Sequence, residues 1–268
     1  MGIVLVGCGK MGGAMLEGWL DQGVPKSSIR IIEQNPEHAQ ALRDTHDIIV
    51  LDDAKDVEDG FPADIVILAV KPQMMDEAVL ACKGFVGRGT YMSIAAGKTI
   101  SYFEGLLGAE ASIVRVMPNT PAAVRRGVSV GCANAHVSGE AKEKCTSLLE
   151  AVGEVAWVED EALIDGVTAV SGSGPAYVFY MTECLTEAGI KAGLSEELAT
   201  QLARATVAGA GELMRQSGIA ASQLRTNVTS PGGTTQAALE VLMGENGIGP
   251  IFEKAVYAAV QRSKELAG

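Results

Sequence analysis

The sequence predicts an α/β protein in which a doubly wound sheet domain is followed by an all-α domain. Two observations carry this prediction. In the first half, short apolar runs alternate with helix-length segments, which is the pattern of a parallel sheet with helices on its faces. After Glu159 the strand signals stop, and helical periodicity continues along the chain. We therefore predict one domain over residues 1–159 and a second over residues 160–268.

The composition bounds the partners and the location. The 268 residues include 21 basic and 33 acidic side chains, a net charge of −12, which argues against nucleic acid or an anionic membrane as a partner. No apolar run approaches the roughly 20 residues of a membrane-spanning helix, and a strand pattern directly after Met1 leaves no room for a signal peptide. Five scattered cysteines predict reduced thiols in a cytoplasmic protein, and the cysteines and histidines form no metal-site pattern.

The first strand and the turn after it are the strongest local signal. The apolar run 3–6 leads into a G-x-G-x-x-G turn formed by Gly7, Gly9 and Gly12, and a helix pattern follows over 11–22. A second strand, 29–32, ends at Glu33. This order is typical of a Rossmann-type dinucleotide site. The first glycine allows the tight turn, the second lets a pyrophosphate approach the backbone, and the third lets helix and strand pack closely.

The same alternation extends the sheet. Further strands are predicted at 48–50, 64–70, 90–94, 112–117, 128–133 and 155–158, with helices at 74–83, 101–107 and 138–152. Unusual residues gather where these strands end, at 71–72, 95–97 and 118–121. Ligands bind at the carboxyl edge of such sheets. We therefore expect the small residues at 95–97 to leave room for a ring, and the loop around Asn119 to hold an amide-bearing group.

The charges near the end of the second strand bear on the choice of cofactor. An acid such as Glu33 usually accepts a hydrogen bond from a ribose 2′-hydroxyl and disfavours a 2′-phosphate. Gln34 and Asn35 are alternative partners for this position. Nearby positive charges that would neutralise a phosphate are Lys10, Arg30 and Arg43. The sequence therefore predicts a nicotinamide dinucleotide, with NADPH and NADH both open.

The second half is predicted to consist of helices, including 161–169, 176–192, 198–214, 236–243 and 249–266. The segment 176–192 is apolar on nearly every side, and such a helix must be buried all round. So few helices can hardly bury it within one chain. We therefore expect this domain to pack against its copy in a homodimer.

The chemistry expected of the helical domain follows from its polar residues. It contains no histidine, and its lysines lie in amphipathic contexts typical of solvated faces. Its loop 227–235 carries four hydroxyl side chains and a Gly-Gly turn before a helix, whose free N–H groups suit an anion. Hydroxyl groups are poor acids but good donors, so reduction of a basic C=N bond suits this loop better than reduction of a ketone.

Five motifs, in order along the whole chain, resemble those of pyrroline-5-carboxylate reductases. They are G-C-G-K-M-G at 7–12, A-V-K-P at 69–72, M-P-N-T-P at 117–121, T-A-V-S-G-S-G-P-A-Y at 168–177 and V-T-S-P-G-G-T-T at 228–235. The last two are specific, whereas the glycine turn is shared by many enzymes. The resemblance implies an NAD(P)H-dependent oxidoreductase that passes a hydride to the C=N bond of Δ1-pyrroline-5-carboxylate. The product would be L-proline, in the last step of proline biosynthesis.

The resemblance also implies roles for individual residues. The cofactor would contact Gly7, Gly9, Lys10, Met11, Gly12, Gln34, Ala69, Val70, Lys71, Pro72, Ala95, Ala96 and Asn227. The substrate would contact Ser230, Gly232, Gly233, Thr234 and Thr235, and Thr235 would be the catalytic residue, donating to the imine nitrogen. The resemblance implies a homodimer or higher oligomer with a dimerising helical domain and an active site shared between subunits.

Two other functions fit part of the pattern. A β-hydroxyacid dehydrogenase shares the two-domain plan, but it would require a catalytic lysine on an early helix of the second domain, and none is evident. A redox-sensing regulator binds NAD(P) without catalysis, but its pocket would lack the hydroxyl groups found at 227–235.

Overall fold

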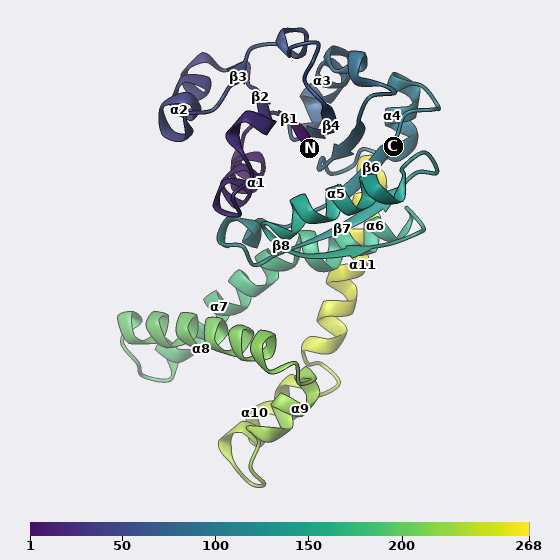
Figure 1. Cartoon of the computed structure of the whole chain (residues 1–268). Helices are drawn as coiled ribbons and strands as arrows, with labels where there is room; N and C mark the ends of the chain where they lie inside the picture. Colours follow the sequence, from purple (N-terminus) through teal and green to yellow (C-terminus); the bar gives the residue numbers. More distant parts are fainter. Residues whose placement is uncertain (268) are drawn as a thin grey trace. The chain divides into compact units, whose positions relative to one another are not determined.

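The computed structural model describes residues 1–267, which form two compact units (Figure 1). The first unit contains residues 1–172 together with the end of the chain from Val260, and the second contains Ser173–Ala259. These units are defined by which residues pack together, and the first one extends to residue 172, beyond the domain boundary predicted at residue 159. The Ser263 hydroxyl lies 2.6 Å from the Asp165 carboxylate, so the last turns of the chain are joined to the first unit.

The first unit is built on an eight-stranded sheet with the strand order β3-β2-β1-β4-β5-β6-β7-β8. The strands are β1 (Gly2–Val6), β2 (Ile29–Ile32), β3 (Val50–Leu51), β4 (Ala63–Leu68), β5 (Thr90–Ser93), β6 (Ile113–Met117), β7 (Gly127–Ala133) and β8 (Gly153–Trp157). The chain leaves β1 toward β2 on one side and later adds β4 on the other. The order therefore reverses between β1 and β4, which is the switch point where ligands bind in such sheets.

The sheet is mixed, which corrects the prediction of an entirely parallel arrangement. β7 pairs with β6 in antiparallel register, with Val114 opposite Ala133, whereas every other pair of neighbours is parallel. Only residues 118–126 join β6 to β7, and they contain the short 3₁₀-helix Thr120–Val124. A parallel return requires a crossover of a dozen or more residues, so this short link imposes an antiparallel one.

The predicted burial of the strands on both faces is confirmed. Ile3 and Leu5 of β1 belong to one buried cluster, whereas Val4 and Val6 belong to another. Neighbouring side chains on a strand point to opposite faces, so the two clusters lie on the two sides of the sheet. Helices cover both faces: α1 (Lys10–Asp21), α2 (Pro36–His46), α3 (Met75–Ala81), α4 (Ile100–Leu107), α5 (Gly139–Glu150) and α6 (Leu163–Val167).

Helix α2 is absent from the sequence-based predictions, although its start carries a clear signal. The Asn35 side chain accepts a hydrogen bond from the His38 backbone N–H at 2.9 Å, and Pro36 occupies the first helical position. Asparagine at the cap followed by proline is a common helix start. The weak apolar content of this segment hides the helix from a search for hydrophobic periodicity.

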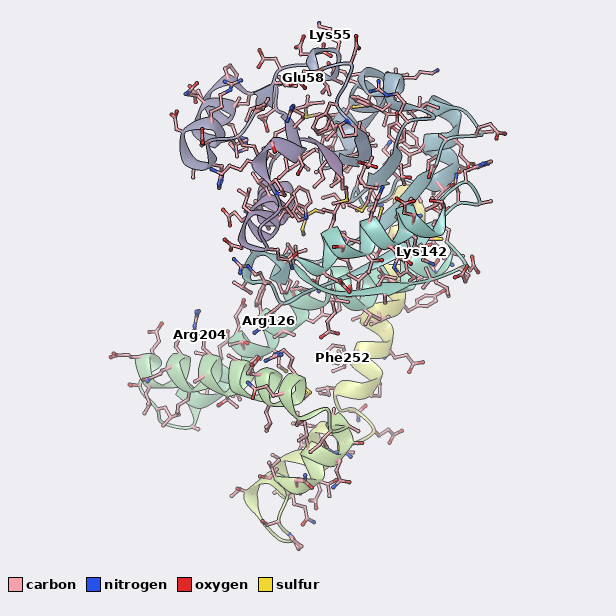
Figure 2. All side chains as sticks on the ribbon, viewed as in Figure 1. Lys55, Glu58, Arg126, Lys142, Arg204 and Phe252 are labelled. Carbon is pink, nitrogen blue, oxygen red and sulfur yellow. The ribbon has the colours of Figure 1, made fainter. Side chains whose placement is uncertain are left out.

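The second unit is helical, as predicted, and contains α7 (Gly174–Lys191), α8 (Glu196–Ser217), α9 (Ala221–Asn227), α10 (Thr234–Leu242) and most of α11 (Ile248–Ala267). Close contact between α7 and α8 uses small residues, since a Cβ added at Gly189 would lie 3.2 Å from the Ala199 methyl group. Phe252, labelled in Figure 2, packs edge-on against Tyr177 with ring centroids 6.2 Å apart. None of the described helices is long and apolar enough to cross a membrane.

One chain does not bury the apolar segment 176–192, as expected from the small number of helices in this domain. No residue of α7 is buried, and Phe179 and Tyr180 are 61% and 67% exposed. Apolar side chains of α8 and α10 are also exposed, including Leu213 and Val241. An exposed apolar surface of this extent is typical of a protein–protein interface.

The two tryptophans provide a test of core packing. Trp19 is fully buried, and its indole N–H donates to the Leu148 carbonyl, which lies in the last turn of α5. We expect Trp19→Phe to lower the free energy of unfolding by about 1–3 kcal/mol, because a buried carbonyl loses its partner. Half-buried Trp157 donates to the Thr146 hydroxyl, which can rotate toward another partner. Trp157→Phe should therefore lower the free energy of unfolding by less than Trp19→Phe does. Urea denaturation of the two variants checks this order, and equal losses would contradict it.

Candidate functional site

The glycine turn lies at the carboxyl end of β1 and leads into α1. Gly7 has φ +83°, and a Cβ there would approach the Val70 side chain to 2.7 Å. A Cβ at Gly12 would lie 2.6 Å from the Gly7 carbonyl oxygen. Both positions therefore require glycine, the first for its conformation and the second for the close approach of α1 to the turn.

Gly9 differs from its two neighbours because the space around it is open. A Cβ added there would meet no atom within 4 Å, and its φ of −69° is ordinary for any residue. No side chain caps α1 at Gly9, and the first helical bond runs from the Gly13 N–H to the Gly9 carbonyl. The N–H groups of Lys10, Met11 and Gly12 thus form a helix N-terminus facing open space, which suits a pyrophosphate.

Glu33 follows β2 and turns its carboxylate back toward the glycine turn. One oxygen accepts from the Cys8 backbone N–H at 3.3 Å and lies 3.0 Å from His38 Nδ1. The other accepts from the Asn35 backbone N–H at 3.0 Å. Burial raises the pKa of the Cys8 thiol to about 12, with smaller contributions from the charges of Glu33 and Glu17. The Cys8 thiol is therefore protonated at neutral pH, and the Glu33 carboxylate lies directly beside the turn.

A cleft opens at this edge, between the ends of β1, β2, β3 and β4. Gly7, Glu33, Gln34 and Val70 line it, so the cleft brings together four residues for which the sequence predicts a cofactor role. Asp52 and Asp53, which follow β3, and Glu77 on α3 also line it. These three acids were absent from the predicted site, although Asp52 and Asp53 also follow a strand at the carboxyl edge.

The remaining strand ends hold the other predicted cofactor residues. The Ala69 N–H donates to the Val6 carbonyl at 2.8 Å, which ties the end of β4 to β1. Lys71 and Pro72 are exposed where the 3₁₀-helix Pro72–Met74 begins. After β5, Ala95 is buried with its N–H on the Ser93 hydroxyl, whereas Ala96 is exposed.

Two expectations about these loops need correction. The room predicted at Gly97 is occupied, since a Cβ there would lie 2.9 Å from the backbone oxygen of Leu266 in α11. Both ends of the Asn119 amide are also engaged. Its nitrogen donates to the Ser171 carbonyl at 3.2 Å, and its oxygen accepts from the Val128 N–H at 2.9 Å. The Asn119 side chain thus links β7 to the π-helical turn Thr168–Gly172 by hydrogen bonds.

The loop 227–235 belongs to the second unit and leads into α10. Gly232 has φ +73°, its N–H donates to the Gln236 side chain at 2.7 Å, and the Gly233 N–H donates to the Ser230 carbonyl at 3.0 Å. Gly233 starts α10 without a side-chain cap. The N–H groups of the first turn, beginning with Thr234 and half-buried Thr235, are therefore the ones that an anion would meet. The Asn227 side-chain oxygen accepts from the Gln223 amide at 2.8 Å.

Comparison with known proteins identifies the family. Residues 161–266 match the model described as pyrroline-5-carboxylate reductase dimerisation, and residues 2–97 match that of the coenzyme F420-dependent NADP oxidoreductases. The pyrroline-5-carboxylate reductase of Pseudomonas aeruginosa is 42% identical over 99% of this chain and 96% of its own length. That of Corynebacterium melassecola is 38% identical over 98% of each chain.

The chain belongs to the pyrroline-5-carboxylate reductase family.

Solved structures of the family agree with the fold. The pyrroline-5-carboxylate reductase of Coxiella burnetii superimposes with a TM-score of 0.94 at 35% identity, covering 99% of this chain and 98% of that one. The Plasmodium falciparum enzyme, whose structure has NADP bound, gives a TM-score of 0.82 at 29% identity over 100% and 98% of the two chains. The predicted Rossmann-type sheet followed by a helical domain is thus the fold of this reductase family.

The contrast between Gly9 and Gly12 makes a test of the glycine turn. We expect Gly9→Val to keep the free energy of unfolding within about 1 kcal/mol of wild type, since valine is only a poorer helix cap. The same variant should lose dinucleotide binding, because the side chain fills the open space at the helix N-terminus. Gly12→Val should lose about 1–3 kcal/mol through overpacking against the Gly7 carbonyl.

Urea denaturation and a binding titration of both variants check this difference. Unimpaired dinucleotide binding by Gly9→Val, or a Gly12→Val protein as stable as wild type, would contradict the assignment of the turn.

Proposed function

We propose that this chain is an NAD(P)H-dependent reductase of Δ1-pyrroline-5-carboxylate that forms L-proline in the last step of proline biosynthesis. The observation that carries the proposal is the likeness, over 99% of the chain at 42% identity, to a pyrroline-5-carboxylate reductase. The geometry supports this reaction. One unit has an uncapped helix N-terminus after a glycine turn, suited to the cofactor, and the other has an uncapped helix N-terminus rich in hydroxyl groups, suited to the substrate. The proposed location is the cytoplasm, where the free cysteines would stay reduced.

The first unit would bind the cofactor. Gly7 to Gly12 would hold the pyrophosphate on the N–H groups of α1, since Gly9 leaves the approach open. Gln34 and Val70 would line the adenosine side of the cleft. Ala69, Lys71, Pro72, Ala95 and Ala96 would border the rest of the cofactor at the carboxyl edge, and Asn227 would reach it from the second unit's loop. When bound, the nicotinamide supplies the hydride.

The loop of the second unit would bind the substrate. The Thr234 N–H and hydroxyl would bind the carboxylate, which a helix N-terminus favours. Ser230, Gly232 and Gly233 would complete this cradle, and the two glycine N–H groups would exchange their present loop partners for the carboxylate. Thr235 would donate a hydrogen bond from its hydroxyl to the imine nitrogen, which aligns the C=N bond and supports positive charge at carbon.

The role of Thr235 is tested by removing and restoring its hydroxyl. We expect Thr235→Ala to lower kcat about 10- to 100-fold, because one hydrogen bond made at the reacting nitrogen is worth about 1.5–3 kcal/mol. Thr235→Ser keeps the hydroxyl and should recover most of the activity. Thr226→Ala is the matched control, because the Thr226 hydroxyl donates to the Ser222 carbonyl of its own helix.

The assay follows oxidation of NADH and of NADPH with pyrroline-5-carboxylate. Turnover of Thr235→Ala equal to that of Thr226→Ala would refute the role of Thr235. Absence of wild-type turnover with either cofactor would refute the proposed reaction.

Dimerisation through the second unit is tested at α7, none of whose residues is buried in one chain. We expect Phe179→Glu to shift the wild-type dimer toward monomer, because a charge would be buried against the partner's apolar surface. Leu80→Glu is the control, since Leu80 is a 52% exposed leucine of the sheet unit. Light scattering during gel filtration should show dimers for wild type and Leu80→Glu. An unchanged mass for Phe179→Glu would contradict the interface.

A further inference from the structure

Glu33 is positioned to recognise the ribose of the cofactor. Its side chain is only 14% exposed and lines the cleft at the end of β2. Three groups hold its carboxylate: the Cys8 N–H, the Asn35 N–H and the His38 ring. A carboxylate has about four acceptor sites, so one remains for a ligand hydroxyl. The group is thus fixed in place while still able to accept a hydrogen bond.

The cleft around Glu33 is acidic. Asp52, Asp53 and Glu77 line it together with Glu33, and no lysine or arginine is among the described residues that line it. A 2′-phosphate carries a charge of about −1.5 to −2 at neutral pH. Placed in this cleft, it would face several carboxylates without a cation in the wall.

The two arginines that the sequence places near this site do not line the cleft and have partners within the protein. Arg30 is buried, and its guanidinium makes two bonds to Glu58, at 2.9 and 3.1 Å, while stacking on the Phe61 ring. Arg43 donates to the Val50 carbonyl at 2.8 Å and lies 3.8 Å from Asp52.

Two lysines are the next cations to consider. Lys55, labelled in Figure 2 at the edge of the first unit, is bound to Asp53 at 3.1 Å. Lys10 lines a different groove, together with Gly9 and Glu17 on α1, which is the pyrophosphate side of the turn. None of these four cations lines the cleft itself, although Arg43 and Lys55 pair with two of its acids, Asp52 and Asp53.

We propose that this chain selects NADH over NADPH and that Glu33 is the residue that determines the choice. The inference rests on the proposed function and adds to it which of the two nicotinamide cofactors the site prefers. The carboxylate accepts from the ribose 2′-hydroxyl of NADH and repels the 2′-phosphate of NADPH, while the acidic wall increases the repulsion.

The test measures binding without substrate, so that it is independent of turnover. The full chain is titrated with NADH and with NADPH, followed by nicotinamide fluorescence. We expect NADH to bind wild type at least tenfold more tightly, a ratio that corresponds to about 1.4 kcal/mol. Glu33→Gln removes the charge and should narrow this ratio at least tenfold, mainly by strengthening NADPH binding. Glu37→Gln, an exposed acid in the first turn of α2, is the charge-matched control and should leave the ratio unchanged.

Two further measurements assign the discrimination to the ribose position. The competitors 5′-AMP and 2′,5′-ADP differ only in the 2′-phosphate, and their relative affinities should follow those of NADH and NADPH. Raising the salt concentration should narrow the wild-type ratio, because repulsion between partly exposed charges is screened.

The inference is overturned if wild type binds NADPH as tightly as NADH, or if Glu33→Gln and Glu37→Gln change the ratio equally. Failure to bind either cofactor would overturn both this inference and the proposed function. Selective NADH binding without reduction of pyrroline-5-carboxylate would support the specificity of the cleft and refute the proposed reaction alone. Thermal unfolding of each variant confirms that the compared proteins are folded.

Discussion

The close approach of α1 to the glycine turn is the contact on which the cofactor side depends. Gly12 brings the helix to the Gly7 carbonyl, at a distance that leaves no room for a Cβ. This contact aims the free N–H groups of the first helical turn at the carboxyl edge of the sheet. The same turn presents the Cys8 N–H to Glu33, so one backbone arrangement orders both the proposed pyrophosphate site and the acid beside it.

In the second unit, the fold of one chain leaves many apolar side chains exposed. α7 has no buried residue, whereas the sheet unit buries apolar side chains on both faces of its strands. Burial of a large apolar side chain is worth about 1.5–3 kcal/mol, so the exposed faces of these helices favour association strongly. The family's dimerisation model covers this region, and packing between copies accounts for its composition.

The features that could be predicted from the sequence are those with a local signal. The direction of strand pairing and the hydrogen-bond partners of single side chains depend on distant segments and could not be predicted. The strands were predictable because each is a short apolar run, and the glycine turn because its residues are adjacent. The antiparallel direction of β7 depends on how far the chain travels before returning, which apolar runs do not encode. The loop around Asn119 was expected to hold an amide-bearing group, but the Asn119 side chain itself bonds Ser171 and Val128, which come from distant segments. α2 has few apolar residues and α9 is only seven residues long, so neither gave the apolar signal on which the predictions relied.

By itself, the sequence determined the class of the fold, the dinucleotide turn and the hydroxyl-rich loop, because each is written in neighbouring residues. It left the choice between NADH and NADPH open, because Glu33 would disfavour a 2′-phosphate whereas the nearby Lys10, Arg30 and Arg43 could neutralise one. The tertiary structure changed that balance. It showed that Arg30 is bound to Glu58 and Arg43 to the Val50 carbonyl, whereas Asp52 and Asp53 join Glu33 in the cleft. Electrostatic selectivity depends on which charges face the ligand, and only the fold brings those charges together.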